Sequence, residues 1–206
     1  MKAMQQKRIL VFFGMTGSGK SYLSTAWAQN HGCQRLNTDV VRKEYIIKTN
    51  SRQLTEKGID KGIYTPELTR RTYEQLLDLT EKALADPSSS CVVLDGSFQR
   101  ASDRRQLVER FHGRASMFFI FCHCNEHVTR SRLGIRRADP MSVSDGDLDV
   151  YLHQLTKFEN PTEIQHRMLL ELDTDASLEY LIDRLDCFLA RTGAEHSGST
   201  RLDETK

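Results

Sequence analysis

An eight-residue segment near the start of the chain carries the most specific chemical pattern in the sequence. It matches G-x-x-x-x-G-K-[ST] at every fixed position and lies between an apolar run and a helical stretch. This pattern is typical of loops that bind nucleotide phosphates, because glycines let successive backbone N–H groups point at one anion and the helix start adds positive charge. We therefore expect ATP to bind through the whole segment, which comprises Gly14, Met15, Thr16, Gly17, Ser18, Gly19, Lys20 and Ser21.

Three side chains are expected to act on the phosphates and on a Mg²⁺ ion. Lys20 is predicted to be catalytic, because the lysine of this pattern reaches the β- and γ-phosphates, and the Ser21 hydroxyl is predicted to bind Mg²⁺. The apolar run Val92–Leu94 ends in Asp95, and a carboxylate at the carboxyl end of a buried strand can hold the same ion. The alternative is that Asp95 only caps a loop.

A second acidic candidate follows the expected second strand. Asp39 stands where a carboxylate can take the proton of an acceptor hydroxyl, so it is predicted to be both catalytic and substrate-binding. Arg42 lies one helical turn later on the same side and is predicted to bind an anionic group of the substrate. The alternative is that Asp39 is a helix N-cap and Arg42 an exposed charge.

The segment 129–137 concentrates arginines with little compensating acid. It leads into Ala138-Asp139-Pro140, and Arg132 and Arg136 are four residues apart and share a helix face. We expect an arginine-rich lid in which these two residues are catalytic, because arginines that close over phosphates neutralise charge and exclude water. The alternative is an ordinary solvated helix face.

The cysteines and histidines indicate no metal site of comparable specificity. The segment Cys122-His123-Cys124 has zinc-binding residue types but lacks a second pair, so buried thiols are favoured over zinc. All five cysteines are scattered along the chain, which favours reduced thiols over a disulfide framework. Asp173–Ala176 follows the last expected strand, where the backbone could meet the adenine.

Short apolar runs alternate with amphipathic stretches, which predicts βαβ units and a doubly wound parallel sheet. The expected strands are Arg8–Phe13, Gln34–Asn37, Cys91–Leu94, Ser116–Cys122 and Met168–Leu172. The expected helices are Lys20–Gln29, Val40–Ile47, Pro66–Ala85, Ala101–Phe111, Asn125–Leu133, Asp145–Phe158 and Leu178–Ala190. Thr65-Pro66-Glu67 is typical of a helix start, and Ser144 with Asp147 resembles a capping box. The polar segment Lys48–Ile63 is expected to be mobile over the site.

Composition limits the class of protein. The chain has 206 residues, 38% of them hydrophobic, with 29 Lys+Arg against 28 Asp+Glu, and this fits one domain, expected over residues 1–190, with a flexible tail over 191–206. The net charge of +1 does not favour a nucleic-acid partner, although a local basic patch stays possible. With neither a leader segment nor an apolar run of about 20 residues, we expect a cytoplasmic location and no membrane partner.

The ordered set of motifs resembles one known group. The phosphate-binding loop, Thr38–Lys43, Val92–Arg100 and the following Asp103-Arg104-Arg105 are similar to the P-loop predicted kinases (AAA_33-like) related to zeta toxins and polynucleotide 5′-kinases, over roughly Arg8 to Asp175. The resemblance implies an α/β fold, a P-loop NTPase three-layer sandwich with a five-stranded parallel sheet and helices on both faces. It also implies ATP and Mg²⁺ as cofactors, with the catalytic and substrate-binding residues named above.

The expected function is transfer of the γ-phosphate of ATP to a hydroxyl of a small molecule. Relatives act on nucleotide sugars, polynucleotide ends, small sugars and antibiotics, so the acceptor is left open, as is the oligomeric state. Two alternatives remain at this point: a polynucleotide 5′-hydroxyl kinase, and an ATP-binding regulatory module without transfer. An intact set of Lys20, Ser21, Asp39 and Asp95 speaks against the last, because pure binding requires no base.

Overall fold

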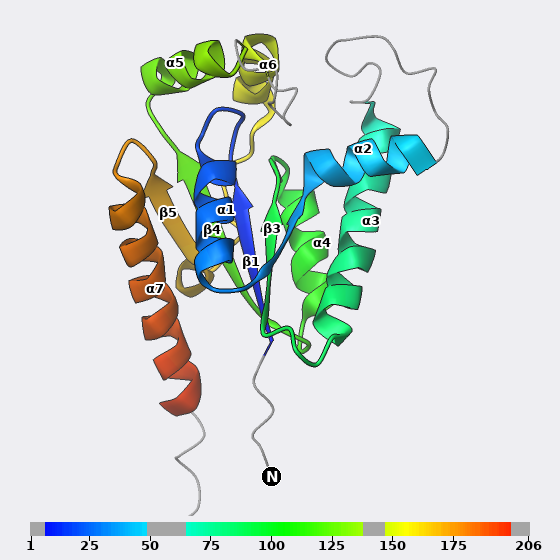
Figure 1. Cartoon of the computed structure of the whole chain (residues 1–206), viewed down its shortest axis with the longest axis vertical. Coiled ribbons are helices and arrows are strands. Elements are labelled where there is room, and N and C mark those ends of the chain that lie inside the picture. The colour runs from blue at the N-terminus through cyan, green and yellow to red at the C-terminus, as the bar shows by residue number, and fades with distance from the viewer. Residues whose placement is uncertain (1–6, 49–64, 138–146, 199–206) are drawn as a thin grey trace, which may run out of the picture.

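A five-stranded parallel sheet with the strand order β2-β3-β1-β4-β5 forms the centre of the molecule (Figure 1). The computed structural model describes residues 7–48, 65–137 and 147–198, with side chains through residue 192. The strands are β1 (Arg8–Phe13), β2 (Gln34–Asn37), β3 (Cys91–Asp95), β4 (Ser116–His123) and β5 (Leu169–Asp173). All five strands predicted from the sequence are confirmed, with ends that differ by at most one residue.

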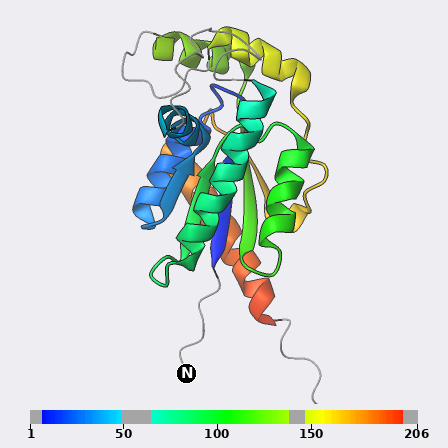
Figure 2. The same ribbon diagram turned by 90° about the vertical axis from the view of Figure 1, so that its right-hand side faces the viewer.

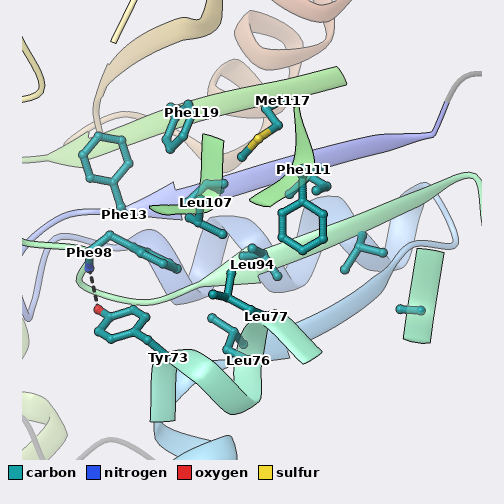
Figure 3. Packing of buried hydrophobic residues seen from close by; sticks show 14 of the residues in the cluster. Phe13, Tyr73, Leu76, Leu77, Leu94, Phe98, Leu107, Phe111, Met117 and Phe119 are labelled. Atoms are coloured by element: carbon teal, nitrogen blue, oxygen red, sulfur yellow. Dashed lines mark hydrogen bonds between the residues drawn. The ribbon is translucent and has the colours of Figure 1, made fainter. Parts of the chain in front are cut away.

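Each apolar strand is buried because both faces of the sheet are covered. Along β1, Ile9, Val11 and Phe13 pack into one core and Leu10 and Phe12 into the other, all fully buried. This is the reason for the unbroken apolar run, since successive side chains of a strand point to opposite faces. The core that includes Phe13 is closed by Leu107 and by α3 side chains such as Leu76, as Figure 3 shows.

Helices cover the two faces and also the carboxyl end of the sheet. The helices are α1 (Lys20–Asn30), α2 (Thr38–Lys48), α3 (Pro66–Ala85), α4 (Ala101–Phe111), α5 (Glu126–Arg137), α6 (Leu148–Lys157) and α7 (Leu178–Gly198). Helices α1 and α7 contribute to one core and α3 and α4 to the other. Helices α5 and α6 lie across the end at which the strands finish (Figures 1 and 2). This placement puts them above the phosphate-binding loop.

Helix starts and ends follow local capping chemistry. Thr65 caps α3 by accepting a hydrogen bond from the N–H of Leu68 at 3.3 Å, with Pro66 in the first turn as predicted. Helix α6 begins later than expected, because Asp147 is its N-cap and accepts from the N–H of Val150 at 3.0 Å. Ser144 of the expected capping box and the segment 49–64 lie outside the described residues.

The C-terminal helix is longer than the sequence predicted. Helix α7 runs to Gly198, so residues 191–198 are helical and do not belong to the expected tail. Residues 199–206 lie outside the described part of the chain. None of the helices in the described ranges is both long and apolar enough to cross a membrane.

The expectation that all cysteines are reduced thiols is wrong for two of them. Cys33 and Cys91 form a disulfide with a Cα–Cα distance of 5.4 Å. Strands β2 and β3 are paired in parallel with Gln34 opposite Val92. Cys33 and Cys91, which directly precede these two residues, are therefore neighbours as well. Their separation of 58 residues in the chain hides this proximity from a reading of spacing alone. Cys122, Cys124 and Cys187 are free.

Candidate active site

A cavity of about 520 Å³ opens at the carboxyl end of the sheet. This is where ligands bind in doubly wound parallel folds. Its walls come from the loop after β1, the starts of α2 and α3, the loop between β3 and α4, and the helices α5 and α6. Of the predicted site residues, the lining contains Thr16, Lys20, Ser21, Asp39, Arg42 and Arg136.

The phosphate-binding loop has the backbone that its glycines make possible. Gly14 has φ 140°, and a Cβ atom there would lie 2.1 Å from the carbonyl oxygen of Cys122. Gly19 is in the left-handed conformation at φ 79° and forms the N-cap of α1. Other residues would be strained at both positions, so the loop that turns β1 into α1 depends on glycine here.

Two groups of the loop fit a bound phosphate. The Lys20 ammonium donates to the carbonyl oxygen of Met15 at 3.2 Å, and no carboxylate of the described residues forms an ion pair with it. The Ser18 hydroxyl is buried without a hydrogen-bond partner among the described residues. A cation and a buried donor that lack strong partners are what the oxygens of a phosphate would satisfy.

The predicted Mg²⁺ ligands lie side by side. The Ser21 hydroxyl donates to Oδ1 of Asp95 at 3.2 Å, and Asp95 is fully buried at the end of β3. The second carboxylate oxygen, Oδ2, accepts from Asn37 Nδ2 at 2.8 Å and also from the Arg35 guanidinium. Hydroxyl and carboxylate oxygens are the hard ligands that Mg²⁺ takes, so the residues present fit the ion. This supports Asp95 as more than a loop cap.

Arg35 and Asn37 were missed from the sequence. They are two residues apart on β2, so they share one face of that strand, and Asn37 pairs in register with Asp95. The i, i+2 spacing at the end of a short strand beside an expected metal carboxylate is the signal that could have found them. Together they hold Asp95 in one orientation and supply the positive charge that a buried carboxylate needs.

Asp39 and Arg42 form an ion pair on the cavity wall. Arg42 Nη1 donates to Oδ1 of Asp39 at 2.9 Å, and only 6% of Arg42 is exposed. The N–H groups of Asp39 and Val40 both donate to the side-chain oxygen of Asn37, at 2.9 and 3.1 Å. Asn37 therefore caps α2, and the alternative of a capping Asp39 with an exposed Arg42 is wrong on both counts.

The two expected lid arginines contact different parts of the loop. Arg136 donates to the Thr16 hydroxyl at 3.3 Å and lines the cavity. Arg132 instead donates to Oγ1 and to the carbonyl oxygen of Thr174, at 2.9 and 2.7 Å, and does not line the cavity. Thr174 in turn donates to the carbonyl oxygen of Ser18 at 2.8 Å. The segment after β5 thus supports the phosphate-binding loop, and Arg132 holds that segment.

Helix α6 also contacts the loop, which the sequence did not indicate. The side-chain oxygen of Gln154 accepts from the backbone N–H of Thr16 at 2.7 Å. The helix also brings Val150 and His153 to the cavity wall. This side of the cavity is therefore formed by α5 and α6 together, and both helices contact Thr16.

The opposite wall is built by α3 and the loop between β3 and α4. The Tyr73 hydroxyl accepts from the N–H of Phe98 at 3.0 Å, and Phe98 has a positive φ of 38° (Figure 3). Burial raises the pKa of Tyr73 to about 12, so its hydroxyl stays protonated at neutral pH. Arg70, Arg100 and Asp103 add charge to this wall.

Asp103 yields a prediction on the pH dependence of stability. Burial raises the pKa of Asp103 even though the Arg100 and Arg104 charges oppose the shift. A carboxyl whose pKa is higher in the folded than in the unfolded state opposes folding once it is ionised. We expect Asp103→Asn to increase the free energy of unfolding at pH 7, and the gain to vanish as the pH falls below about 4. Urea denaturation at both pH values measures this, and a gain that is the same at both would contradict it.

The cysteines beside the loop have structural contacts. Cys122 is buried in β4, and burial raises the pKa of its thiol to about 12, so it is an inert thiol. Cys124 contacts the Thr129 hydroxyl at 3.1 Å and Arg132 Nη1 at 3.5 Å. Within the described ranges no group of three or more His, Cys, Asp or Glu residues is arranged to hold a metal ion.

One family model matches most of the chain. A family model described as an AAA domain (AAA_33) matches residues 9–161, which span the phosphate-binding loop, both acidic candidates and the helices α5 and α6. No curated protein matches the sequence at a significant level.

Solved structures share the fold at low sequence identity. A gluconokinase from Sinorhizobium meliloti 1021 aligns with a TM-score of 0.66 and 20% identity, over 97% of this chain and 100% of that one. The APS kinase CysC of Mycobacterium tuberculosis, in complex with AMPPNP and APS, aligns with a TM-score of 0.57 and 16% identity, over 90% and 98%. A shikimate kinase from Bacteroides thetaiotaomicron gives 0.56 and 20%, over 90% and 99%. These likenesses confirm the predicted α/β fold, that of P-loop kinases.

Proposed function

The chain belongs to this AAA-domain family, and from that premise we propose that it is an ATP-dependent kinase that phosphorylates a hydroxyl of a small molecule. The observation that carries the proposal is the shared cavity, which brings Lys20 and Ser21 of the phosphate-binding loop together with the Asp39–Arg42 pair. A pure nucleotide-binding module has no use for a carboxylate aimed into the same space. The volume of the cavity suits a small acceptor.

The residues of the cavity divide the chemistry between them. Asp39 accepts the proton of the acceptor hydroxyl while the oxygen of that hydroxyl forms a bond to the γ-phosphorus. The bond between the γ-phosphorus and the β–γ bridging oxygen breaks, and ADP is released. Arg42 holds the Asp39 carboxylate in place. Lys20 and the loop N–H groups bind the phosphates and stabilise the charge on them during transfer.

The metal and lid residues complete the arrangement. Mg²⁺, when bound, neutralises phosphate charge, and Ser21 and Asp95 are the residues that would hold it. Arg136 is proposed to act on the transferring phosphate, since it reaches Thr16 from above the loop. Arg132, predicted as a second catalytic lid arginine, is proposed to act through the Thr174 segment that it holds.

Replacing Lys20 with alanine tests the phosphate-binding assignment. We expect kcat to fall by about 10²–10³-fold, because one preorganised charge on the transferring phosphate is lost. The melting temperature is expected to change little, since among the described residues the Lys20 ammonium forms a single hydrogen bond, of 3.2 Å, to a backbone oxygen. Unchanged turnover in the variant would remove the assignment.

The direct test of function is transfer of labelled γ-phosphate with Mg²⁺ to a panel of acceptors. The panel contains sugars and sugar acids, nucleosides, aminoglycosides and 5′-hydroxyl oligonucleotides, with the Lys20→Ala protein as the blank. Labelled product from a small-molecule class, absent in the blank, supports the proposal. Product only from oligonucleotides would make the protein a polynucleotide kinase, with a rate that falls steeply with salt. ATP binding without any transfer would favour the regulatory module.

A further inference from the structure

Gln154 occupies a position at the phosphate-binding loop that a ligand would also need. Its side-chain oxygen accepts from the Thr16 N–H at 2.7 Å, and both residues line the cavity. Thr16 is only 5% exposed, so its N–H has little contact with solvent apart from the cavity. In a loop of this type the backbone N–H groups are the donors that phosphate oxygens accept from. The Gln154 oxygen therefore stands where a phosphate oxygen would be bound.

One N–H group cannot fully serve two acceptors. The Thr16 hydroxyl is already held by Arg136 of α5, so the two lid helices contact one residue of the loop through its two polar groups. A phosphate oxygen that takes the Thr16 N–H has to displace Gln154, and with it the contact that fixes α6 to the loop. Because Val150 and His153 of α6 also line the cavity, this exchange alters the part of the cavity wall that α6 forms.

We propose that Gln154 is a positioning residue that occupies the place of a terminal phosphate oxygen until the nucleoside triphosphate displaces it. The inference rests on the proposed ATP site and adds to it a competition between the protein's own amide oxygen and the γ-phosphate. Through this competition the position of α6 depends on the third phosphate. A bound triphosphate and a bound diphosphate then leave the α6 side of the cavity in different positions.

Two substitutions of opposite sign test the competition. Gln154→Met keeps the length of the side chain but removes the competing oxygen, so we expect Mg²⁺–AMPPNP to bind about two- to tenfold more tightly, the range of one net hydrogen bond. Gln154→Glu places a carboxylate at the same N–H, where it both competes more strongly and repels the phosphate, so binding is expected to weaken by a similar factor. Isothermal titration calorimetry measures both, and affinity for Mg²⁺–ADP is expected to change less.

Gln29→Met is the matched control, because Gln29 is exposed at the end of α1 and does not line the cavity. Circular dichroism verifies that every variant is folded. If Gln154 had only a structural role, the Gln154→Met and Gln154→Glu variants would not change the affinity for AMPPNP in opposite directions. Unchanged AMPPNP affinity in both variants, weaker binding to the Met variant, or equal changes for AMPPNP and ADP would each overturn the inference. Absence of nucleotide binding to the wild-type protein and to all variants would instead refute the proposed ATP site.

Discussion

Replacing Asp39 with asparagine is expected to lower kcat by a factor on the order of 10²–10⁴ while the affinity for ATP stays nearly the same. The amide keeps the shape of the side chain but cannot accept the proton of the acceptor hydroxyl. The Asp39 carboxylate accepts a hydrogen bond from Arg42 and lies outside the phosphate-binding loop. We therefore expect nucleotide affinity not to depend directly on the charge of Asp39. Steady-state kinetics with the identified acceptor and calorimetry with AMPPNP measure the two effects separately.

The control for this substitution lies on the same helix. Glu44→Gln makes the same change of carboxylate to amide on α2, at an exposed residue outside the cavity lining. It is expected to leave kcat, AMPPNP affinity and the melting temperature unchanged. If ATP binding collapsed together with turnover in Asp39→Asn, Asp39 would belong to the metal site or to the fold. A loss of kcat of less than about tenfold would exclude it as the base.

The fold was predictable because the sequence patterns are local. Strands such as Arg8–Phe13 are apolar runs, helices such as α3 have an amphipathic face, and the glycine pattern fixes where the first strand turns into a helix. The parallel order of the strands then follows from the alternation of strands and helices. Ends set by one side chain were less predictable, as the Asp147 cap of α6 shows.

The positions of the candidate site residues were predictable where a residue belongs to a local sequence motif. The loop, Asp95, Asp39 and Arg42 were found because they follow strands whose carboxyl ends meet at one edge of the sheet. The residues that hold them were missed, because their partners are remote in the chain. Arg35 contacts Asp95 across 60 residues and Gln154 contacts Thr16 across 138. The spacing of Arg35 and Asn37 on β2 is only a weak signal of the first contact, and the local pattern of α6 holds none of the second.

Arg104 belongs to the same class of remote contacts and has the largest expected effect on stability. It is fully buried and donates to the carbonyl oxygens of Phe98 and Glu159, at 2.7 and 2.9 Å, and to the Glu163 carboxylate. It therefore connects the strained turn at Phe98, whose neighbours Ser97 and Gln99 line the cavity, with the segment that leads from α6 to β5. Arg104 thus reinforces the hydrogen bonds of Glu159 with Gln99 and Ala101, which join the same two parts of the chain.

Replacing Arg104 with methionine is expected to lower the free energy of unfolding by about 3–5 kcal/mol, because it leaves a nearly buried carboxylate and two carbonyl oxygens without their donor. Arg105→Met is the control, since Arg105 is the exposed neighbour on α4 and its loss is expected to cost less than about 0.5 kcal/mol. Urea denaturation of both variants measures the difference, and equal effects would contradict the role of Arg104.

The pH dependence separates the charge of this pair from its packing. Burial opposes the shift, but the Arg104 hydrogen bonds hold the pKa of Glu163 below its usual value of 4.5. A carboxyl with a lowered pKa in the folded state contributes stability above its unfolded pKa and loses it as the pH falls. The difference between the wild-type protein and Arg104→Met is therefore expected to shrink as the pH is lowered from 7 to about 3. Glu163→Gln keeps an oxygen that can accept from Arg104, and it is expected to remove most of this pH dependence. If the difference in stability between the wild-type protein and Arg104→Met stayed constant with pH, Arg104 would act through packing and its carbonyl contacts alone.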